Sequence, residues 1–230
     1  MHEYSISREI VERVLARRGR LRVFEELLPK TTALIIVDMQ NTFLRPGAPV
    51  EVPEARDIVP NINKLNKSLR RLGVKIIWVT HANKNKEGIS DWPGFFDYFV
   101  SSNVREKTLR GLEPNAEGQK LWGELEVESN DIKIFKNRYS ALIPGSSDLR
   151  NILHLNNIDT ILIAGTKTNV CCESTARDAM MLDYKTVMLS DCCAALSEEE
   201  HRATLDIFFQ QFGDVMTSDE ILQILSSNRN

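Results

Sequence analysis

The chain has 230 residues, which suffice for one large domain with a substantial core and are few for two. With 29 Lys and Arg against 32 Asp and Glu, the net charge of −3 gives no general attraction for nucleic acid or anionic lipid, and neither is expected as a partner. The 42% of hydrophobic and 27% of charged residues exclude an intrinsically disordered chain, and no apolar stretch approaches the length of a membrane span.

Residues 1–30 are predicted to form a helical extension ahead of a main domain at 31–230. Apolar residues between Ile6 and Leu15 recur at intervals that suit an amphipathic helix, whose apolar stripe has to be buried. The helix either docks on its own domain or packs against a second subunit, so a homo-oligomer, dimer or tetramer, is expected. Residues 1–22 carry many charges where a signal peptide needs an apolar stretch, which predicts a cytoplasmic location.

The main domain alternates short apolar runs with longer amphipathic ones. The expected strands are residues 33–39, 74–80, 131–135, 160–165 and 186–191, with a weaker one at 214–216. The expected helices are residues 58–72, 147–155, 170–182 and 198–209. Continuous Val, Ile and Leu runs are typical of strands buried on both faces, and the alternation with helices predicts crossover connections. We therefore predict an α/β fold with three layers (α/β/α), a mostly parallel sheet of about six strands and a Rossmann-like strand order.

The longest segment without clear periodicity runs from residue 81 to residue 114. A loop of that length in a compact domain is usually functional. It also contains several aromatic residues, namely Trp92, Phe95, Phe96 and Tyr98. Because exposed loop tips rarely carry so many aromatic side chains, we predict a partly ordered lid or pocket wall.

Three residues follow the ends of expected strands, where open parallel sheets bind their ligands. Asp38 closes ALIIVD, Lys136 follows DIKIF, and Cys171 lies in the turn GTKTNVC before a helix. Singly, each has a structural reading, as a turn cap, a surface lysine and a small buried residue. Together they predict the base, cation and nucleophile of covalent acyl transfer, because a helix N-terminus and a nearby lysine lower the pKa of a cysteine and favour its thiolate.

The four cysteines form two adjacent pairs, Cys171 with Cys172 and Cys192 with Cys193. Adjacent cysteines rarely reach unstrained disulfide geometry, so reduced thiols are expected. We read Cys172, Cys192 and Cys193 as structural residues that possess no chemistry of their own, although Cys192 and Cys193 could border the pocket. A four-cysteine zinc site is the alternative, but adjacent pairs lack the gap that lets two sulfurs reach one metal.

Three motifs resemble those of the isochorismatase-like cysteine hydrolases, a family that includes nicotinamidases, N-carbamoylsarcosine amidases and ureidoacrylate amidohydrolases. They are VDMQNTF (37–43), IFKNRYSAL (134–142) and AGTKTNVCCESTARDAM (164–180), in the family's order and near its spacing. The resemblance runs from about Thr32 to the last strand and implies an isochorismatase-like fold. It also implies Asp38 as the general base and acid, Lys136 as the triad cation and Cys171, directly after Thr-Asn-Val, as the nucleophile.

The same resemblance makes the turn before the nucleophile an oxyanion hole, formed by the N–H groups of Lys167 and Cys171. In the family this turn commonly contains a non-proline cis peptide, which is expected here between Lys167 and Thr168. Lys167 departs from the small or apolar residue usual there, so its side chain either points away or assists an anionic substrate. Leu142 is a second departure, where phenylalanine is commoner, and it concerns the shape of the pocket.

No metal and no other cofactor is expected. The nicotinamidases of this family hold a metal with an aspartate and two histidines after the second strand, whereas this chain has His81 alone in THANKNKEG, and one imidazole does not hold a catalytic metal. GTKT lacks the glycine five residues before Gly165 that a phosphate-binding Walker loop needs, and GxGxxG is absent.

We therefore expect a metal-independent cysteine amidohydrolase that cleaves the C–N bond of a small linear amide or ureide through a covalent thioester or thiocarbamate. The alternatives are an isochorismatase-type vinyl ether hydrolase, a nicotinamidase-like amidase and a non-catalytic oligomeric binding protein. The residues expected to bind the substrate, each with a structural role as the alternative, are Gln40, Phe43, His81, Asn83, Trp92, Tyr139 and Thr168.

Overall fold

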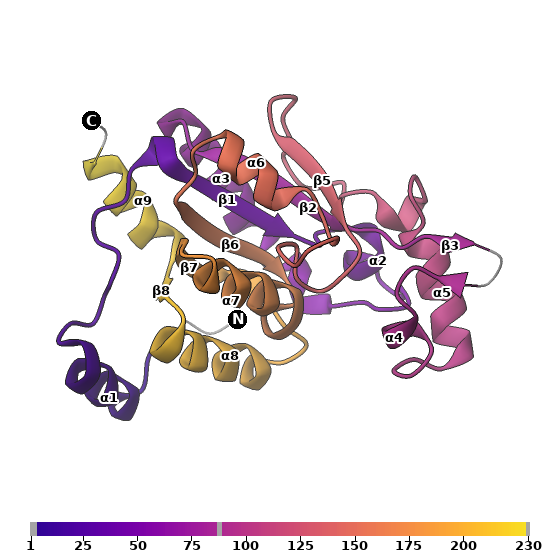
Figure 1. The fold of residues 1–230 in the computed structure, drawn as a ribbon, viewed down its shortest axis with the longest axis horizontal. Coiled ribbons are helices and arrows are strands. Elements are labelled where there is room, and N and C mark those ends of the chain that lie inside the picture. Colours follow the sequence, from indigo (N-terminus) through magenta and orange to yellow (C-terminus); the bar gives the residue numbers. More distant parts are fainter. Residues whose placement is uncertain (1–3, 87–88, 229–230) are drawn as a thin grey trace.

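A computed structural model describes residues 4–86 and 89–228 of the chain as an α/β fold (Figure 1). Its main sheet has six parallel strands in the order β5-β2-β1-β6-β7-β8. These strands are β1 (Thr32–Val37), β2 (Lys75–His81), β5 (Ile132–Lys136), β6 (Thr160–Thr166), β7 (Lys185–Ala194) and β8 (Asp214–Met216). The predicted layers and the sheet of about six strands are confirmed, and the sheet is parallel throughout.

Helices cover both faces of this sheet. Helix α3 (Val59–Leu72) packs with α9 (Ser218–Ser227) on one face. The other face is covered by α6 (Leu149–Leu155), α7 (Glu173–Met181) and α8 (Glu198–Gln211) (Figure 1). Helix α9 was not among the expected elements, although Thr217 and Glu220 form a capping box at its start.

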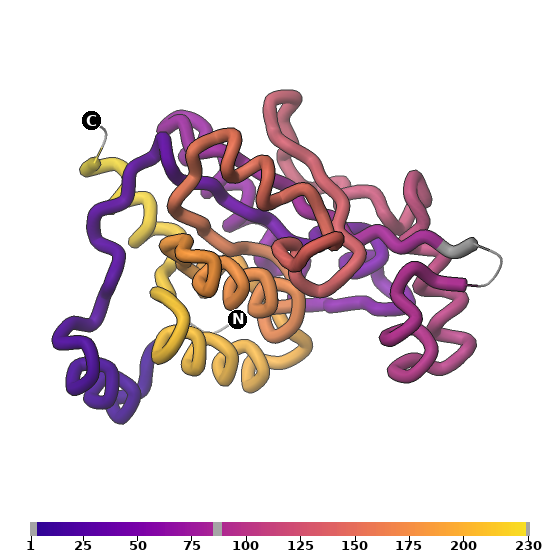
Figure 2. The backbone as a smooth tube through the Cα atoms, viewed as in Figure 1, coloured from indigo at the N-terminus to yellow at the C-terminus, as the bar shows by residue number. Residues whose placement is uncertain are grey.

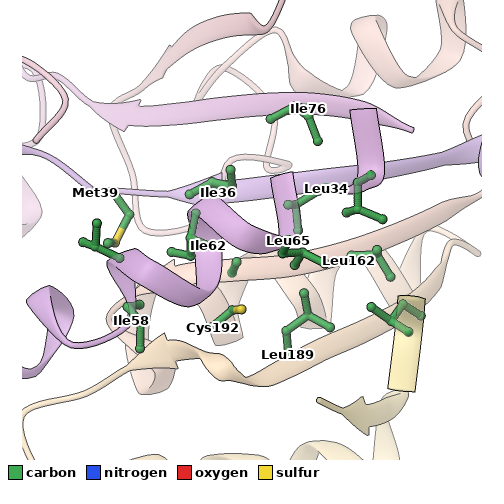
Figure 3. Close-up of a cluster of buried hydrophobic side chains, with 14 of the residues drawn as sticks. Leu34, Ile36, Met39, Ile58, Ile62, Leu65, Ile76, Leu162, Leu189 and Cys192 are labelled. Atoms are coloured by element: carbon green, nitrogen blue, oxygen red, sulfur yellow. The ribbon is translucent and has the colours of Figure 1, made fainter. Parts of the chain in front are cut away.

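The core consists of two apolar layers separated by the sheet. Figure 3 shows Ile62 and Leu65 of α3 against Leu34 and Ile36 of β1, all fully buried. The strands present apolar residues on both faces because parallel strands with helices on each side have no solvent-facing side. This buried sheet gives the residues at its carboxyl edge a fixed scaffold.

The N-terminal helix α1 (Arg8–Arg18) packs against α8 of the same chain (Figures 1 and 2). Its residues Ile10 and Val14 are buried, and the guanidinium of Arg18 lies 4.7 Å from the centre of the Phe209 ring. Of the two arrangements considered above, docking on its own domain is therefore the one found. Packing against a second subunit, the homo-oligomer and the boundary after residue 30 stay predictions.

The segment from 81 to 114 is more ordered than expected. It contains a short hairpin of β3 (Asn85–Lys86) and β4 (Ile89–Ser90), followed by α4 (Pro93–Phe96) and α5 (Ser102–Leu112), while residues 87–88 lie outside the described part. Short helices α2 (Asn41–Leu44), η2 (Pro53–Arg56) and η3 (Glu117–Gln119) lie nearby, and η1 (Pro29–Thr31) precedes β1. Phe96 is buried, but Tyr98 is 83% exposed, so the prediction of a lid or wall built from all four aromatic residues is wrong for Tyr98.

No helix within residues 4–86 and 89–228 combines the length and the apolarity that a membrane crossing requires.

Candidate active site

The chemically important residues meet at the carboxyl ends of four neighbouring strands. Asp38 directly follows β1, His81 ends β2, and Lys136 ends β5. Cys171 lies in η4 (Thr168–Cys172), a single π-helical turn between β6 and α7. Because His81 and Lys136 are paired in the register of β2 and β5, the sheet itself places their side chains together.

Two unusual backbone positions bring the ends of β1 and β6 together. Gly165 has φ +113°, and a Cβ on it would lie 2.1 Å from the carbonyl oxygen of Val37, so only glycine permits this approach. Asp38, the next residue after Val37, has φ +55°, a left-handed conformation that aspartate tolerates better than most residues. The carboxylate thereby lies beside the turn that carries Cys171.

Asp38 and Lys136 form a buried ion pair. The Lys136 Nζ lies 2.8 Å from the Asp38 Oδ2, and each residue is 1% exposed. Burial raises the pKa of Asp38, and the Lys136 charge offsets only part of this rise. Burial acts to lower the pKa of Lys136, but the charges of Asp38 and Cys171 outweigh it, and the net shift is upward. Lys136 therefore stays an ammonium at neutral pH.

The surroundings of Cys171 favour a thiol over a thiolate. Burial, followed by the negative charge of Asp38, raises the pKa of Cys171 well above its usual value, and the Lys136 charge opposes this without reversing it. The thiolate expected from the helix N-terminus and the lysine stays a prediction, and burial and the neighbouring carboxylate act against it. The side-chain atoms of Asp38, His81 and Cys171 all lie within 4.8 Å of one another.

The turn before Cys171 is close to the expected one. The non-proline cis peptide joins Thr166 and Lys167, one bond earlier than predicted, because β6 runs to Thr166 and the turn starts there. The carbonyl of Lys167 accepts the N–H groups of Val170 and Cys172, at 3.1 and 3.2 Å, which flank the N–H of Cys171.

A pocket of about 490 Å³ opens over this cluster. Asp38 and Cys171 line it, whereas Cys172 is buried behind it in the apolar layer. Four of the residues expected to bind substrate also line it, namely Phe43, His81, Trp92 and Tyr139. Trp92 is the centre of the aromatic wall, with the Tyr139 ring edge-on at 4.7 Å and the Phe95 ring stacked at 4.9 Å. Burial raises the pKa of Tyr139 to about 12, so its phenol is neutral.

The other three expected substrate residues lie outside the lining and support it. Gln40 is fully buried, donates from Nε2 to the carbonyls of His81 and Gln119, and accepts the His81 N–H through Oε1 at 2.6 Å. The Thr168 hydroxyl is 2.8 Å from Nδ1 of the buried His201. Asn83 contacts His81, as described below. Their amide and hydroxyl groups already have partners within the protein, which favours the structural alternative, and direct substrate contact by these three residues stays a prediction.

Several lining residues were missed by the sequence reading. They come from the loop before η2, from α5 and from the turns after β6 and β7, and are Ala48, Pro49, Val50, Glu51, Val52, Thr108, Leu112, Thr166, Val170 and Leu196. The amphipathic pattern of residues 102–112 was a detectable signal for α5. However, no pattern in these residues indicated that the helix would face the ends of β1 and β6.

The remaining cysteines are buried and reduced. Cys192 packs in the layer of α3, whereas its neighbour Cys193 packs in the layer of Cys172, because successive residues of β7 point to opposite faces of the sheet. The four-cysteine zinc site is therefore excluded for these residues.

The donor atoms near Cys171 do not fit a divalent cation. Within the described residues, the one group of three metal-binding side chains is Asp38, His81 and Cys171. The Lys136 ammonium lies 2.8 Å from the Asp38 carboxylate and 3.0 Å from the His81 Nδ1, so a cation would have to displace a positive charge. The His81 Nε2 is 2.7 Å from the Asn83 Oδ1. Both imidazole nitrogens thus have partners already.

Comparisons with known proteins agree with this fold. The isochorismatase domain model matches residues 32–220. The chain is 31% identical over 219 residues to a ureidoacrylate amidohydrolase of Acinetobacter baylyi, covering 89% of this chain and 87% of that protein. It is also 31% identical over 178 residues to a protein of Arabidopsis thaliana described as a probable inactive nicotinamidase, covering 76% of this chain and 87% of that protein.

A solved structure supports the same assignment. The cysteine hydrolase from Pseudomonas syringae pv. phaseolicola superimposes with a TM-score of 0.80 at 29% identity, and the match covers 91% of this chain and 98% of that one. This chain therefore belongs to the isochorismatase family of hydrolases.

Proposed function

We propose that the protein is a cysteine amidohydrolase that cleaves the C–N bond of a small linear amide or ureide without a metal. The observation that carries this proposal is the position of the Cys171 thiol and the Asp38 carboxylate on one pocket, with the Lys136 ammonium against Asp38. A thiol, a base and a balancing cation are the groups that covalent catalysis at an amide carbonyl uses. The ureidoacrylate amidohydrolase and the cysteine hydrolase described above support the same chemistry by similarity.

The first half of the reaction forms a covalent intermediate. Asp38 accepts the thiol proton of Cys171 as the sulfur attacks the carbonyl carbon of the substrate. The N–H groups of Lys167 and Cys171 then stabilise the oxyanion, a contribution of about 3–4 kcal/mol for one such donor. Asp38 returns the proton to the leaving ammonia or amine, and a thioester or thiocarbamate remains on Cys171.

The second half restores the enzyme. A water molecule loses a proton to Asp38 and attacks the thioester carbonyl, and the acid or carbamate leaves as Cys171 regains its proton. The positive charge of Lys136 offsets the negative charges of the Asp38 carboxylate and of the thiolate that develops on Cys171, so both can exist in this buried site.

The direct test is release of ammonia from a panel of ureidoacrylate, N-carbamoylsarcosine, biuret, triuret and nicotinamide. We expect turnover of at least one ureide by the wild-type protein and none by Cys171→Ala. The aromatic wall around Trp92 is the reason for keeping nicotinamide in the panel. If no amide or ureide is hydrolysed and isochorismate is, the vinyl ether alternative replaces the proposal. A protein inactive on all of these compounds, but able to bind one, would be a binding protein.

A chelator is expected to leave the activity unchanged. The Lys136 ammonium occupies the position between Asp38 and His81 that a cation would need. After dialysis against EDTA, kcat/KM should stay within about twofold of its initial value, whereas loss of a catalytic metal would remove several kcal/mol of transition-state stabilisation. Stoichiometric zinc or iron in the purified protein, with activity that depends on it, would contradict this prediction.

Lys167 gives the pocket an unbalanced positive charge. Among the charged lining residues, Asp38 is paired with Lys136, and Glu51 with Arg56 at 2.8 Å. Lys167 also lines the pocket, and its ammonium forms no hydrogen bond or ion pair with another described residue. We therefore expect the protein to prefer substrates that carry a carboxylate.

The variant Lys167→Met tests this preference with matched substrates. For an amide that carries a carboxylate, such as succinamate, kcat/KM should fall about tenfold or more, the size of a charge-assisted hydrogen bond. For its neutral methyl ester the change should be small, and Lys167→Arg should retain the preference. Equal losses on both substrates would show that Lys167 acts only through the backbone of the turn.

A further inference from the structure

The Lys136 ammonium is held on three sides. Besides the ion pair with Asp38, its Nζ donates to the His81 Nδ1 at 3.0 Å and to the carbonyl oxygen of Arg138 at 3.1 Å. An ammonium has three protons, and the hydrogen bonds to His81 and Arg138 use two of them, while the Asp38 carboxylate is held by the ion pair. His81 is 4% exposed. Unlike Asp38, it is an uncharged partner of Lys136, because an imidazole that accepts through Nδ1 is neutral.

Asp91 determines which nitrogen of His81 carries the proton, because it orients the amide of Asn83. The Asn83 Nδ2 lies 2.7 Å from a carboxylate oxygen of Asp91, which accepts and does not donate. The Asn83 amide oxygen therefore faces His81, and at 2.7 Å from Nε2 it must accept the imidazole proton. With its proton on Nε2, the ring has a lone pair on Nδ1, and this lone pair faces Lys136.

We propose that Asp91, Asn83 and His81 form a hydrogen-bonded arm that positions the Lys136 ammonium against Asp38 and Cys171, with His81 as the positioning residue. The inference rests on the catalytic roles proposed above for Lys136, Asp38 and Cys171. It gives a chemical reason for a neutral imidazole at the place where a metal ligand would otherwise be expected. Burial and the Lys136 charge keep the pKa of His81 well below its usual value, in agreement with this state.

Among residues 4–86 and 89–228, the groups around the imidazole already have partners of their own. The charged or titratable groups near it are Lys136 and Arg138 from the end of β5, Asp38 after β1, Cys171 in η4 and, through Asn83, Asp91. Asp38 is already paired with Lys136, and Arg138 donates to the Asp91 carbonyl at 3.1 Å and lies over the Trp92 ring. Loss of the imidazole acceptor therefore removes one of the two hydrogen bonds that hold Lys136, and leaves its ammonium to Asp38, Cys171 and the carbonyl of Arg138.

Two variants of His81 separate positioning from simple space filling. His81→Asn retains an acceptor oxygen near the place of Nδ1, whereas His81→Leu fills similar space without one. The readout is the rate at which iodoacetamide alkylates Cys171, measured from pH 6 to pH 10 with the labelled residue identified by mass spectrometry. This readout needs no substrate, so it stays informative if the amide panel shows no turnover and the proposed function fails.

We expect His81→Leu to move the alkylation profile of Cys171 to higher pH by about one unit, and so to slow labelling near pH 7.5 about tenfold, because a poorly held ammonium stabilises the thiolate less. His81→Asn should stay within about threefold of the wild type. Asn83→Leu, which leaves the imidazole without its fixed tautomer, should shift the profile in the same direction and provides the test if His81→Leu does not fold. A wild-type profile in both leucine variants, or equal slowing in His81→Asn and His81→Leu, would overturn the proposal.

Discussion

Replacing Cys171 by serine is expected to lower kcat for amide hydrolysis by about a thousandfold or more. Asp38 is a carboxylate with a raised pKa and can accept a proton from a thiol during attack, but a serine hydroxyl is a much weaker acid. Steady-state ammonia release measures the loss. Incubation of the wild-type protein with substrate, followed by acid quenching and mass spectrometry, should in addition detect the acyl group on Cys171.

The adjacent cysteine provides the matched control. Cys172 is fully buried, and its Sγ lies 3.8 Å from the carbonyl oxygen of Ala164, away from the pocket lining. Cys172→Val keeps the site apolar with only a small increase in volume and should leave kcat close to that of the wild type, with a loss of about 1–3 kcal/mol in stability. The assignment of the nucleophile would be refuted by the reverse result, in which Cys172→Val is inactive and Cys171→Ser is not.

Replacing Lys136 by methionine is expected to remove activity and to destabilise the fold together. The change leaves the Asp38 carboxylate buried and unpaired, which costs about 3–5 kcal/mol of unfolding free energy at neutral pH. Activity should fall at least about a thousandfold, since no cation then balances the carboxylate and the developing thiolate. Chemical denaturation and ammonia release measure the two effects separately.

The pH dependence of this loss follows from Asp38. Its pKa is raised in the folded protein, and removal of the lysine raises it further, so the folded variant binds more protons than the unfolded one above the usual carboxyl pKa. Stability of Lys136→Met should therefore increase as the pH falls through the raised pKa of Asp38. The double variant Asp38→Asn/Lys136→Met, which has no buried charge, should recover much of the stability at neutral pH but none of the activity. A single variant as stable as the wild type would show that the pair is not buried as described.

Much of the fold is encoded in local patterns of the sequence. The run ALIIVDM can only be buried on both faces, and it became β1 with Asp38 immediately beyond its end. The edge strand β8 was also expected, from three residues alone. The C-terminal helix α9 was overlooked even though Thr217 and Glu220 mark its start, because no strand follows it to give the alternation that was used for the other elements.

The site was predictable to the extent that its residues lie at strand ends. Asp38, Lys136 and Cys171 were found because parallel strands all end at one edge of the sheet. The roles of Gln40 and Asn83 were not, since a buried amide that supports His81 and one that contacts substrate look the same in a sequence. The two roles differ only in which group the folded chain places next to the amide.

The sequence by itself determined the α/β class, the strands of the main sheet, four of the helices that cover it, and the three side chains that meet at the sheet edge, because apolar runs and strand ends are local properties. Only the tertiary structure decided the charge states and the neighbours. It placed Cys171 beside Asp38 in a setting that raises the pKa of the thiol, His81 in a hydrogen bond with Lys136, and the α4–α5 segment as one wall of the pocket. These features depend on burial and on distances between residues far apart in the chain, such as His81 and Lys136, which no local pattern records.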